Sequence, residues 1–287
     1  MIKIEGKKHD LGGGMIIYRI LPDKKKRMVG PFCFLDHMGP IIIKVNQNTD
    51  VRPHPHIGLS TLTYLFDGNL VHRDSVGSVA TISPGEVNWM TAGSGISHSE
   101  RSPDQDRTIS RPFHGLQFWV ALPDGQEDIS PSFFHYTKDQ IPVEENEQRK
   151  MTLIVGEIFD LKSPVKTYSP MILAMIDAKK KFSFEFNFFS FEIAIYVVNG
   201  VVKYKEQEIT EREMMVIDEN ELAKIEVNKG TKFAIIGGEK FMNSRHIWWN
   251  LVSSSKDKIE QAKKQWKEGS FPMVPGEKEF IPLPEYK

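Results

Sequence analysis

Short runs of apolar or alternating residues, each followed by turn-forming residues, occupy most of this chain. Such runs have the length of β-strands, and a period of two places neighbouring side chains on opposite faces of a sheet. The pattern therefore predicts an all-β protein, built as a sandwich or a barrel. The strand-like runs are residues 59–66, 71–82, 115–121, 171–176, 182–198 and 232–236.

A weak internal repeat indicates that the chain holds two similar β-domains. The two strongest hairpin signals have the same form, Tyr-Leu-Phe-Asp-Gly at 64–68 and Tyr-Val-Val-Asn-Gly at 196–200, and lie 132 residues apart. We expect a first domain over 1–143 and a second over 151–287. The charged, unpatterned stretch between them is the natural place for the join.

One helix is expected near the end of the chain. Ser254 and Asp257 have the spacing of a capping box, and Ile259, Ala262 and Trp266 fall on one face of the helix that would follow. Gly269 is a helix stop. The residues from 271 onward carry four prolines and are expected to lie along the surface.

Length and composition exclude several classes of protein. The 287 residues suffice for two domains, and the formal net charge of -1 gives no overall field that would draw the chain to nucleic acid. Charges within the first eight residues interrupt any signal peptide, and no run reaches transmembrane length. We therefore expect a soluble, cytoplasmic protein with no membrane partner. Cys33 is the only cysteine, which excludes an internal disulfide, and it is expected in the core.

Two pairs of polar residues have the spacing of metal ligands. His54 and His56 are two residues apart, so on an extended strand both imidazoles face the same side. His98 and Glu100 repeat that spacing 42 residues after His56, beyond the Gly93-Ser94-Gly95 turn. Either pair alone reads better as satisfied loop or surface residues. Together they favour one metal site with His54, His56, His98 and Glu100 as ligands.

The chemistry of these four side chains indicates which ions they suit. Three neutral nitrogens and one carboxylate oxygen form a borderline-hard set that fits divalent iron, manganese, nickel, cobalt or zinc. Four ligands on an octahedral ion leave two positions open for substrate and for water or dioxygen. We therefore expect one divalent metal per chain in a catalytic setting.

The repeat offset supplies an internal control for this site. Adding 132 to the four ligand positions gives Phe186, Phe188, Gly230 and Lys232, none of which is a good ligand at neutral pH. The second domain is therefore expected to hold no metal and to have filled the equivalent pocket with phenylalanine.

The chain resembles the pirin family over nearly its whole length. This resemblance implies a bicupin fold, two β-sandwich or jelly-roll barrels and a short C-terminal helix, with metal only in the first cupin. It also implies that iron is the favoured metal and that the residues matching the family's ligands are His54, His56, His98 and Glu100. The matching motifs are Gly-Pro-Phe-Cys-Phe-Leu-Asp-His-Met-Gly-Pro at 30–40, Arg-Pro-His-Pro-His-Ile-Gly at 52–58, residues 84–100 ending in His-Ser-Glu, His-Gly-Leu-Gln at 114–117 and Trp-Trp-Asn-Leu-Val-Ser-Ser-Ser at 248–255.

Two positions depart from the commoner family pattern. Many pirins carry arginine and glutamate where this chain has Ile57 and Ser60. We expect these residues to make the rim of the pocket less polar. The usual cupin glutamate would fall near Ser60, so Glu100 is expected to supply the only carboxylate ligand.

Four further histidines divide into two groups. His37 and His114 could either line the pocket or lie in the core with one satisfied partner. His72 and His135 are expected to face solvent. Trp89 and Met90 are expected in the core.

Three functions are compatible with the sequence. Several pirins have quercetin 2,3-dioxygenase activity, so the resemblance implies ring opening of a flavonol-like aromatic by dioxygen, with Glu100 as ligand and proton acceptor. Other pirins act as regulators through protein contacts, which makes a non-enzymatic iron or redox sensor with a protein partner the alternative. A zinc-type hydrolase with the same ligands is a third possibility.

Overall fold

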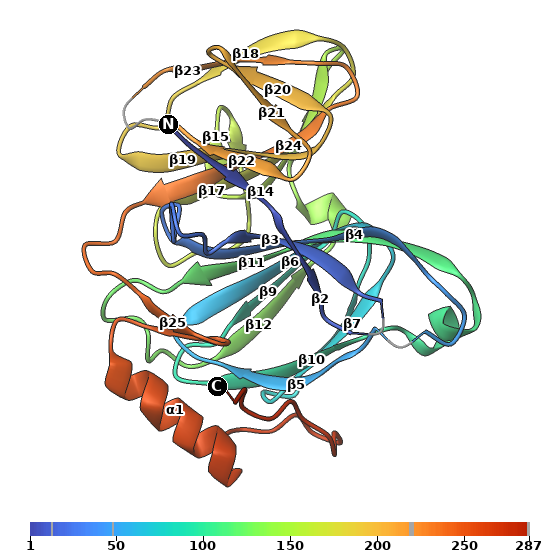
Figure 1. The fold of residues 1–287 in the computed structure, drawn as a ribbon, viewed down its shortest axis with the longest axis vertical. Helices are drawn as coiled ribbons and strands as arrows, with labels where there is room; N and C mark the ends of the chain where they lie inside the picture. The colour runs from blue at the N-terminus through green and yellow to red at the C-terminus, as the bar shows by residue number, and fades with distance from the viewer. Residues whose placement is uncertain (13, 48, 218–220, 286–287) are drawn as a thin grey trace. The chain divides into compact units, whose positions relative to one another are not determined.

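The computed structural model describes residues 1–287 except 13, 48, 218–220 and 286–287. Strands dominate it, and α1 (Lys256–Glu268) is a single long helix within the described residues (Figure 1). The predicted all-β fold is therefore confirmed. The chain forms two compact units. We call them the histidine unit and the phenylalanine unit, after the side chains that equivalent strands of the two units carry. The histidine unit is Asp10–Ile17, Met38–Tyr136 and Phe241–Lys287, and the phenylalanine unit is Met1–His9, Tyr18–His37 and Thr137–Lys240.

The histidine unit contains a large sheet, a four-stranded sheet and a short hairpin. The large sheet has the order β12 (Ser132–Tyr136), β9 (Val87–Thr91), β6 (Leu59–Asp67), β11 (Arg111–Ala121), β4 (Phe32–Ile43), β3 (Ile16–Leu21) and β2 (Lys7–Asp10). The smaller sheet has the order β5 (Val51–His56), β10 (Ile96–Arg101), β7 (Leu70–Asp74) and β8 (Val79–Ile82). The hairpin joins β25 (His246–Trp248) to β26 (Leu251–Ser253), and a 3-10 turn covers Asp104–Thr108.

The phenylalanine unit repeats this plan. Its large sheet has the order β1 (Ile2–Glu5), β22 (Glu213–Val216), β19 (Phe191–Asn199), β24 (Lys232–Glu239), β17 (Met171–Ala178), β14 (Arg149–Val155) and β13 (Val143–Glu145). Its four-stranded sheet has the order β18 (Phe182–Phe186), β23 (Ala223–Val227), β20 (Val201–Tyr204) and β21 (Gln207–Thr210). The hairpin of β15 (Glu157–Ile158) and β16 (Leu161–Lys162) and the 3-10 turn Lys138–Gln140 complete it. Three strands carry the chain from one unit into the other: β2 (Lys7–Asp10), β3 (Ile16–Leu21) and β4 (Phe32–Ile43).

The cores explain why the sequence forms strands. In β18 the three phenylalanines are buried while Ser183 and Glu185 are exposed, which is the period of two that a half-buried strand requires. The phenylalanines pack with apolar side chains of β19, β20 and β23 in one cluster. In the histidine unit Trp89 and Met90 are each 1% exposed, as predicted. Cys33 is also buried.

The internal repeat is visible in the strand order. The order β5-β10-β7-β8 in one unit matches β18-β23-β20-β21 in the other, and the two Tyr-containing turns close β6 and β19 at equivalent places. The constant offset of 132 fails further along. Gly230 lies in a turn and Lys232 begins β24, whereas β23, the strand equivalent to β10, carries Ile225 and Val227. The chain between the equivalent strands differs in length, so a fixed offset does not locate the counterparts of His98 and Glu100.

Two of the predicted strand runs are each a pair of strands. Residues 71–82 form β7 and β8 with a turn around Gly77, and residues 182–198 form β18 and most of β19 with a break at 187–190. In both cases apolar residues lie on either side of a short turn, so the two strands look like one continuous run in the sequence.

The compact units differ from the expected domains 1–143 and 151–287. Residues from Phe241 onward belong with the histidine unit because a β-bridge and hydrogen bonds connect them to it. Leu251 forms a parallel bridge with Ile57, and the buried Arg245 donates to the Leu122 carbonyl oxygen at 2.9 Å. The Glu127 carboxylate accepts from the Ser253 hydroxyl at 2.6 Å. These contacts join residues more than 120 positions apart.

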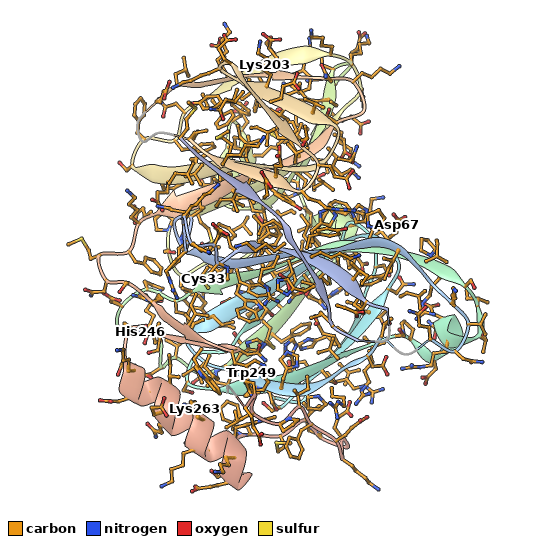
Figure 2. All side chains as sticks on the ribbon, viewed as in Figure 1. Cys33, Asp67, Lys203, His246, Trp249 and Lys263 are labelled. Carbon is orange, nitrogen blue, oxygen red and sulfur yellow. The ribbon has the colours of Figure 1, made fainter. Side chains whose placement is uncertain are left out.

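The C-terminal helix forms where the sequence predicts it. Ile259, Ala262 and Trp266 are its buried residues, and Gly269 ends it in the left-handed conformation. The predicted capping box is wrong. Ser255 is the N-cap, and its side chain makes no capping hydrogen bond. Lys263 lies on α1 (Figure 2), and its ammonium is 4.4 Å from the centre of the Trp248 ring.

Within the described residues, no helix is both long and apolar enough to cross a membrane. The cytoplasmic location expected from the sequence stays a prediction.

We predict that Gly93→Ala destabilises the protein far more than Gly77→Ala. Both glycines have positive φ angles, of 51° and 92°, so both substitutions carry the left-handed penalty of about 1 kcal/mol. A Cβ at Gly93 would lie 1.9 Å from the Ile129 carbonyl oxygen, whereas nothing lies within 4 Å at Gly77. The clash should bring the loss at Gly93 to about 3 kcal/mol in the free energy of unfolding. Equal losses in urea denaturation would show that Gly93 and Ile129 do not approach each other this closely.

Candidate metal centre

Three imidazoles converge inside the histidine unit. His54, His56 and His98 can each offer one ring nitrogen such that all three nitrogens lie within 4.8 Å of one another. The rings are 7%, 1% and 1% exposed, and their centres are 4.4–5.0 Å apart. The structure therefore brings together three of the four residues proposed as ligands from the sequence, and their binding of a metal stays a prediction.

The pairing of β5 with β10 produces this convergence. The two strands run antiparallel, with His98 opposite His54 and Ile96 opposite His56. His54 and His56 share a face because they are two residues apart on β5, and His98 projects from the neighbouring strand onto the same face. The local strand geometry is thus sufficient to bring the rings together.

Backbone carbonyl oxygens hold two of the rings by their outer nitrogens. The Nδ1 of His54 donates to the Arg52 carbonyl oxygen at 2.9 Å, and the Nδ1 of His56 donates to the Asn250 carbonyl oxygen at 3.0 Å. A carbonyl oxygen only accepts, so in a neutral ring the proton sits on Nδ1 and Nε2 keeps its lone pair. Both rings therefore present an Nε2 that can bind a metal.

The nitrogens of two rings lie at a spacing that suits a shared ion. The Nε2 atoms of His56 and His98 are 3.1 Å apart. Two nitrogens that each bind one ion at about 2.1 Å, at a right angle, lie about 3 Å from each other. The donor set and its spacing thus fit a divalent metal.

Burial keeps the imidazoles neutral. It lowers the pKa of His54 to about 4, against the opposing hydrogen bond to Arg52. Burial likewise lowers the pKa values of His56 and His98 well below the ordinary range, and the neighbouring histidines add to the effect. A neutral imidazole is the form that binds metals, so the ligands need no deprotonation at neutral pH.

Glu100 follows His98 by two residues on β10 but is not a member of the group that could share an ion. It is partly buried on β10, and the register between β5 and β10 shifts between His98 and Glu100. Burial raises the pKa of Glu100 to about 7, with a weak opposing contact from the Thr63 hydroxyl at 3.4 Å. That hydroxyl has one proton and lies nearer Gln117, at 2.9 Å. Glu100 as fourth ligand stays a prediction.

The expectation that His72 faces solvent is wrong. His72 is 4% exposed and lies behind His98, with the two Nδ1 atoms 3.3 Å apart, and its Nε2 is 2.9 Å from the Asp74 carboxylate. One histidine in an alternating strand carries no specific signal. The spacing of His72 and Asp74, which repeats the two-residue interval of the ligand pairs, was the available hint.

The other candidate residues fall outside the group of three. His37 is buried in the phenylalanine unit, with Nδ1 2.6 Å from the Tyr196 hydroxyl, and His114 packs against Phe66. His135 is partly buried, with Nδ1 2.8 Å from Asn88 Oδ1.

Ile57 and Ser60, expected to make the rim of the pocket less polar, are both buried. Ile57 is buried in an apolar cluster with α1, and Ser60 is buried against the Thr91 hydroxyl at 3.0 Å. Isoleucine at position 57 therefore has a packing role, because its side chain faces the helix.

The outer face of β10 is bound by the C-terminal tail. Ser97, Ser99 and Arg101 alternate with His98 and Glu100, so they face the other way. Ser97 donates to the Pro272 carbonyl oxygen at 2.5 Å. The Glu277 carboxylate accepts from the Ser99 hydroxyl at 3.0 Å and from Arg101 Nε at 2.8 Å. These hydrogen bonds from the C-terminal tail therefore stabilise the strand that carries His98.

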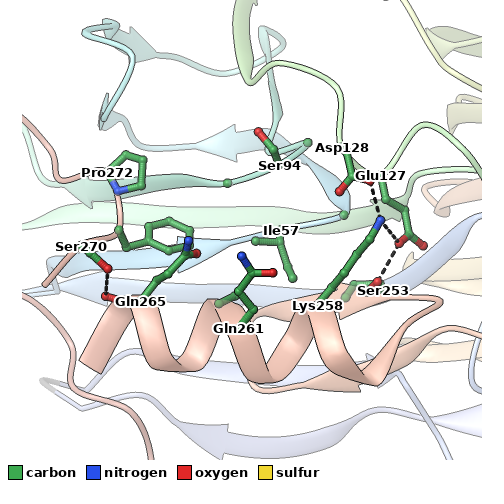
Figure 3. Close-up of a pocket in the computed structure, with 16 residues that line it drawn as sticks. Ile57, Ser94, Glu127, Asp128, Ser253, Lys258, Gln261, Gln265, Ser270 and Pro272 are labelled. Atoms are coloured by element: carbon green, nitrogen blue, oxygen red, sulfur yellow. Dashed lines mark hydrogen bonds and ion pairs between the residues drawn. The ribbon is translucent and has the colours of Figure 1, made fainter. Parts of the chain in front are cut away.

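A polar cavity of about 460 Å³ lies between α1 and the Gly93 turn (Figure 3). None of the three histidines lines it. The Lys258 ammonium beside it is paired with the carboxylates of Asp128 at 2.6 Å and Glu127 at 3.6 Å. The cavity is therefore separate from the candidate metal centre.

Comparison with known proteins gives consistent results along the chain. The pirin family profile matches residues 14–120, and the profile of the pirin C-terminal cupin domain matches residues 172–272. A pirin-like protein from Caulobacter vibrioides is 45% identical over 285 residues, which cover 98% of each chain.

Solved structures show the same architecture. A quercetin 2,3-dioxygenase from Acinetobacter baumannii superposes with a TM-score of 0.92 at 35% identity, covering 100% of this chain and 95% of that one. The bacterial pirin YhhW from Escherichia coli, in complex with nickel(II), has a TM-score of 0.67 at 18% identity, covering 83% and 99%. The second likeness concerns the fold alone.

We predict that removing any one of the three imidazoles abolishes tight metal binding. His54→Ala, His56→Ala and His98→Ala should each fall from about one bound metal per chain to below a tenth after dialysis, because a site that has lost one of its imidazoles holds a divalent ion weakly. Elemental analysis measures this. The control is His135→Ala, which should keep the wild-type metal content. Retention of a full equivalent by two or more of the three variants would place the metal elsewhere.

Proposed function

The chain belongs to the pirin family, and from this premise we propose that it is a metal-dependent dioxygenase that opens the ring of a flavonol or a similar small aromatic compound. The proposed chemistry resembles that named for the Acinetobacter baumannii relative, a quercetin 2,3-dioxygenase. The observation that carries the proposal is the group of three buried, neutral imidazoles whose inner nitrogens converge. Such a group suits a reactive ion held away from bulk water.

Four residues would hold the ion. His54, His56 and His98 supply nitrogens, and we assign Glu100 as the carboxylate ligand, since it extends from β10 two residues after His98. We favour divalent iron, and nickel, manganese, cobalt or zinc suit the same donors. The nickel in the bacterial pirin from Escherichia coli is consistent with this range. When bound, the metal supplies Lewis acidity toward a substrate oxygen and a site for dioxygen.

Glu100 has a second role in the proposal. A flavonol reacts more readily after its hydroxyl loses a proton, and we assign the partly buried carboxylate of Glu100, two residues after His98 on β10, as the group that accepts that proton. The side chain must turn toward the substrate to do so. The contact that opposes this turn is weak, because the Thr63 hydroxyl lies 3.4 Å from Glu100 Oε1 and nearer, at 2.9 Å, to Gln117 Oε1.

The surrounding residues limit the approach of water. The edge of Trp119 packs against His56 with ring centres 5.2 Å apart, and Phe133 stacks on His72 at 4.2 Å. Both aromatic rings lie against the polar cluster. Because they exclude solvent, they strengthen the electrostatic interactions of any charge bound there.

We predict that Glu100→Gln slows oxygen consumption at least 100-fold while the protein keeps most of its metal. The amide is similar in size but cannot accept the substrate proton, and general-base contributions are typically 10²–10⁴-fold. The assay is an anaerobic titration of iron-loaded protein with a flavonol such as quercetin, followed by oxygen-uptake measurement. Metal content is determined on the same samples.

Two results would contradict the proposal. If fully iron-loaded wild type consumes no oxygen with any flavonol, the ring-opening activity is lost as an explanation. If Glu100→Gln retains metal and wild-type turnover, the enzyme assignment stands but Glu100 is not the proton acceptor.

The alternative is a non-enzymatic iron or redox sensor that acts through protein contacts. One observation favours it: among the described residues, the group of possible ligands lies in the histidine unit, which is consistent with a phenylalanine unit that offers a surface to another protein. A sensor must bind a partner differently in its two oxidation states. Pull-downs with ferrous and ferric protein, paired with the oxygen-uptake assay, separate the two functions.

A further inference from the structure

A chain of three polar side chains leads away from the proposed metal centre. The Nδ1 of His98 lies 3.3 Å from the Nδ1 of His72, and the Nε2 of His72 lies 2.9 Å from Asp74 Oδ2. His72 is 4% exposed and Asp74 is 1% exposed. Neither residue belongs to the group of three that could share an ion, and the proposed dioxygenase reaction leaves both without a role.

The strand β7 places this chain behind His98. His72 and Asp74 are two residues apart and share a face, and Asp74 lies opposite His98 on the neighbouring strand β10. Phe133 stacks on the His72 ring with ring centres 4.2 Å apart and planes 10° apart. The orientation of the His72 ring is therefore fixed on one face by an aromatic ring and at one edge by a carboxylate.

The Asp74 carboxylate is held in the turn between β7 and β8. Its Oδ1 accepts from the backbone N–H groups of Val76 at 3.0 Å and Ser78 at 2.9 Å. Burial alone would raise the pKa of Asp74, but the hydrogen bonds from His72 and Ser78 outweigh it and hold the pKa below its ordinary value. Oδ2 of an ionised carboxylate is then free to accept from His72.

The position of each proton follows from the acceptor at the end of the chain. An ionised carboxylate only accepts, so Nε2 of His72 must carry its proton, and Nδ1 of a neutral His72 has a lone pair. That lone pair accepts from Nδ1 of His98. The Nε2 of His98 is consequently left with its lone pair directed toward Nε2 of His56, 3.1 Å away.

The opposite arrangement is unfavourable. If His98 donated from Nε2 to His56, the Nδ1 of His98 would become an acceptor and His72 would have to donate from Nδ1. A neutral His72 would then turn a lone pair toward Asp74, at a cost typical of two buried acceptors in contact. Asp74 therefore selects the tautomer of His98 through the intervening ring of His72.

We propose that His72 and Asp74 are positioning residues that fix the ring and tautomer of His98, so that its Nε2 faces the metal. This proposal rests on the proposed metal centre. His54 and His56 are fixed by backbone carbonyl oxygens, so no side-chain substitution removes their outer bonds. The outer nitrogen of His98 is instead held by the side chain of His72. His72 and Asp74 therefore influence the affinity and the ligand field of the metal through His98.

The test measures cobalt(II) affinity and the visible d–d spectrum of cobalt-loaded protein, in wild type and four variants. His72→Phe keeps a ring to stack on Phe133 but removes the acceptor, and Asp74→Asn lets an amide donate toward His72. Both should weaken cobalt binding about 10- to 100-fold and shift the spectrum. His72→Gln restores an acceptor oxygen and should recover part of the affinity. His135→Phe, on β12 in the same unit, should match wild type.

The outcomes separate this proposal from the metal centre itself. If wild type binds cobalt and both His72→Phe and Asp74→Asn match its affinity and spectrum, the positioning role is wrong while the centre stands. If His135→Phe weakens binding as much as His72→Phe, general loss of packing explains the effect and the role is likewise wrong. If wild type binds no cobalt, the centre and the positioning role fall together.

Discussion

The fold brings one nitrogen from each of three buried imidazoles within 4.8 Å of the others, and the other features of the site follow from that constraint. Burial keeps the rings neutral, and hydrogen bonds on the outer nitrogens of His54 and His56 leave their inner nitrogens bare. Nitrogen lone pairs about 3 Å apart repel one another unless a cation lies between them. A bound cation would relieve this repulsion between the imidazole nitrogens.

The two units show alternative uses of one strand arrangement. In the histidine unit β5 and β10 carry the imidazoles, whereas the equivalent β18 and β23 carry phenylalanine, isoleucine and valine. Those apolar side chains join one continuous core, which stabilises the phenylalanine unit without any ion. The same topology therefore supports a group of buried imidazoles in one unit and a packed apolar interior in the other.

Much of this arrangement could be predicted from residue spacing. The two-residue intervals at His54 and His98 are local, and a strand converts them directly into a shared face. The repeat at Tyr64 and Tyr196 likewise reports a turn that depends on neighbouring residues alone. His72 could not be assigned, because its partners come from other strands. The return of residues 241–287 to the histidine unit was equally hidden, since it rests on contacts such as Arg245 with Leu122. The position of Glu100 could not be predicted from spacing either, because it depends on the shift in register between β5 and β10 after His98.

X-ray absorption spectroscopy of metal-loaded wild-type protein tests whether the three imidazoles share one ion. Imidazole rings produce a multiple-scattering signature that distinguishes them from other nitrogen or oxygen donors. We expect three imidazoles at about 2.1 Å from a single ion, with oxygen completing the shell. A shell with one imidazole or none would contradict the assignment of His54, His56 and His98 as ligands, whatever the affinity of the protein for the metal.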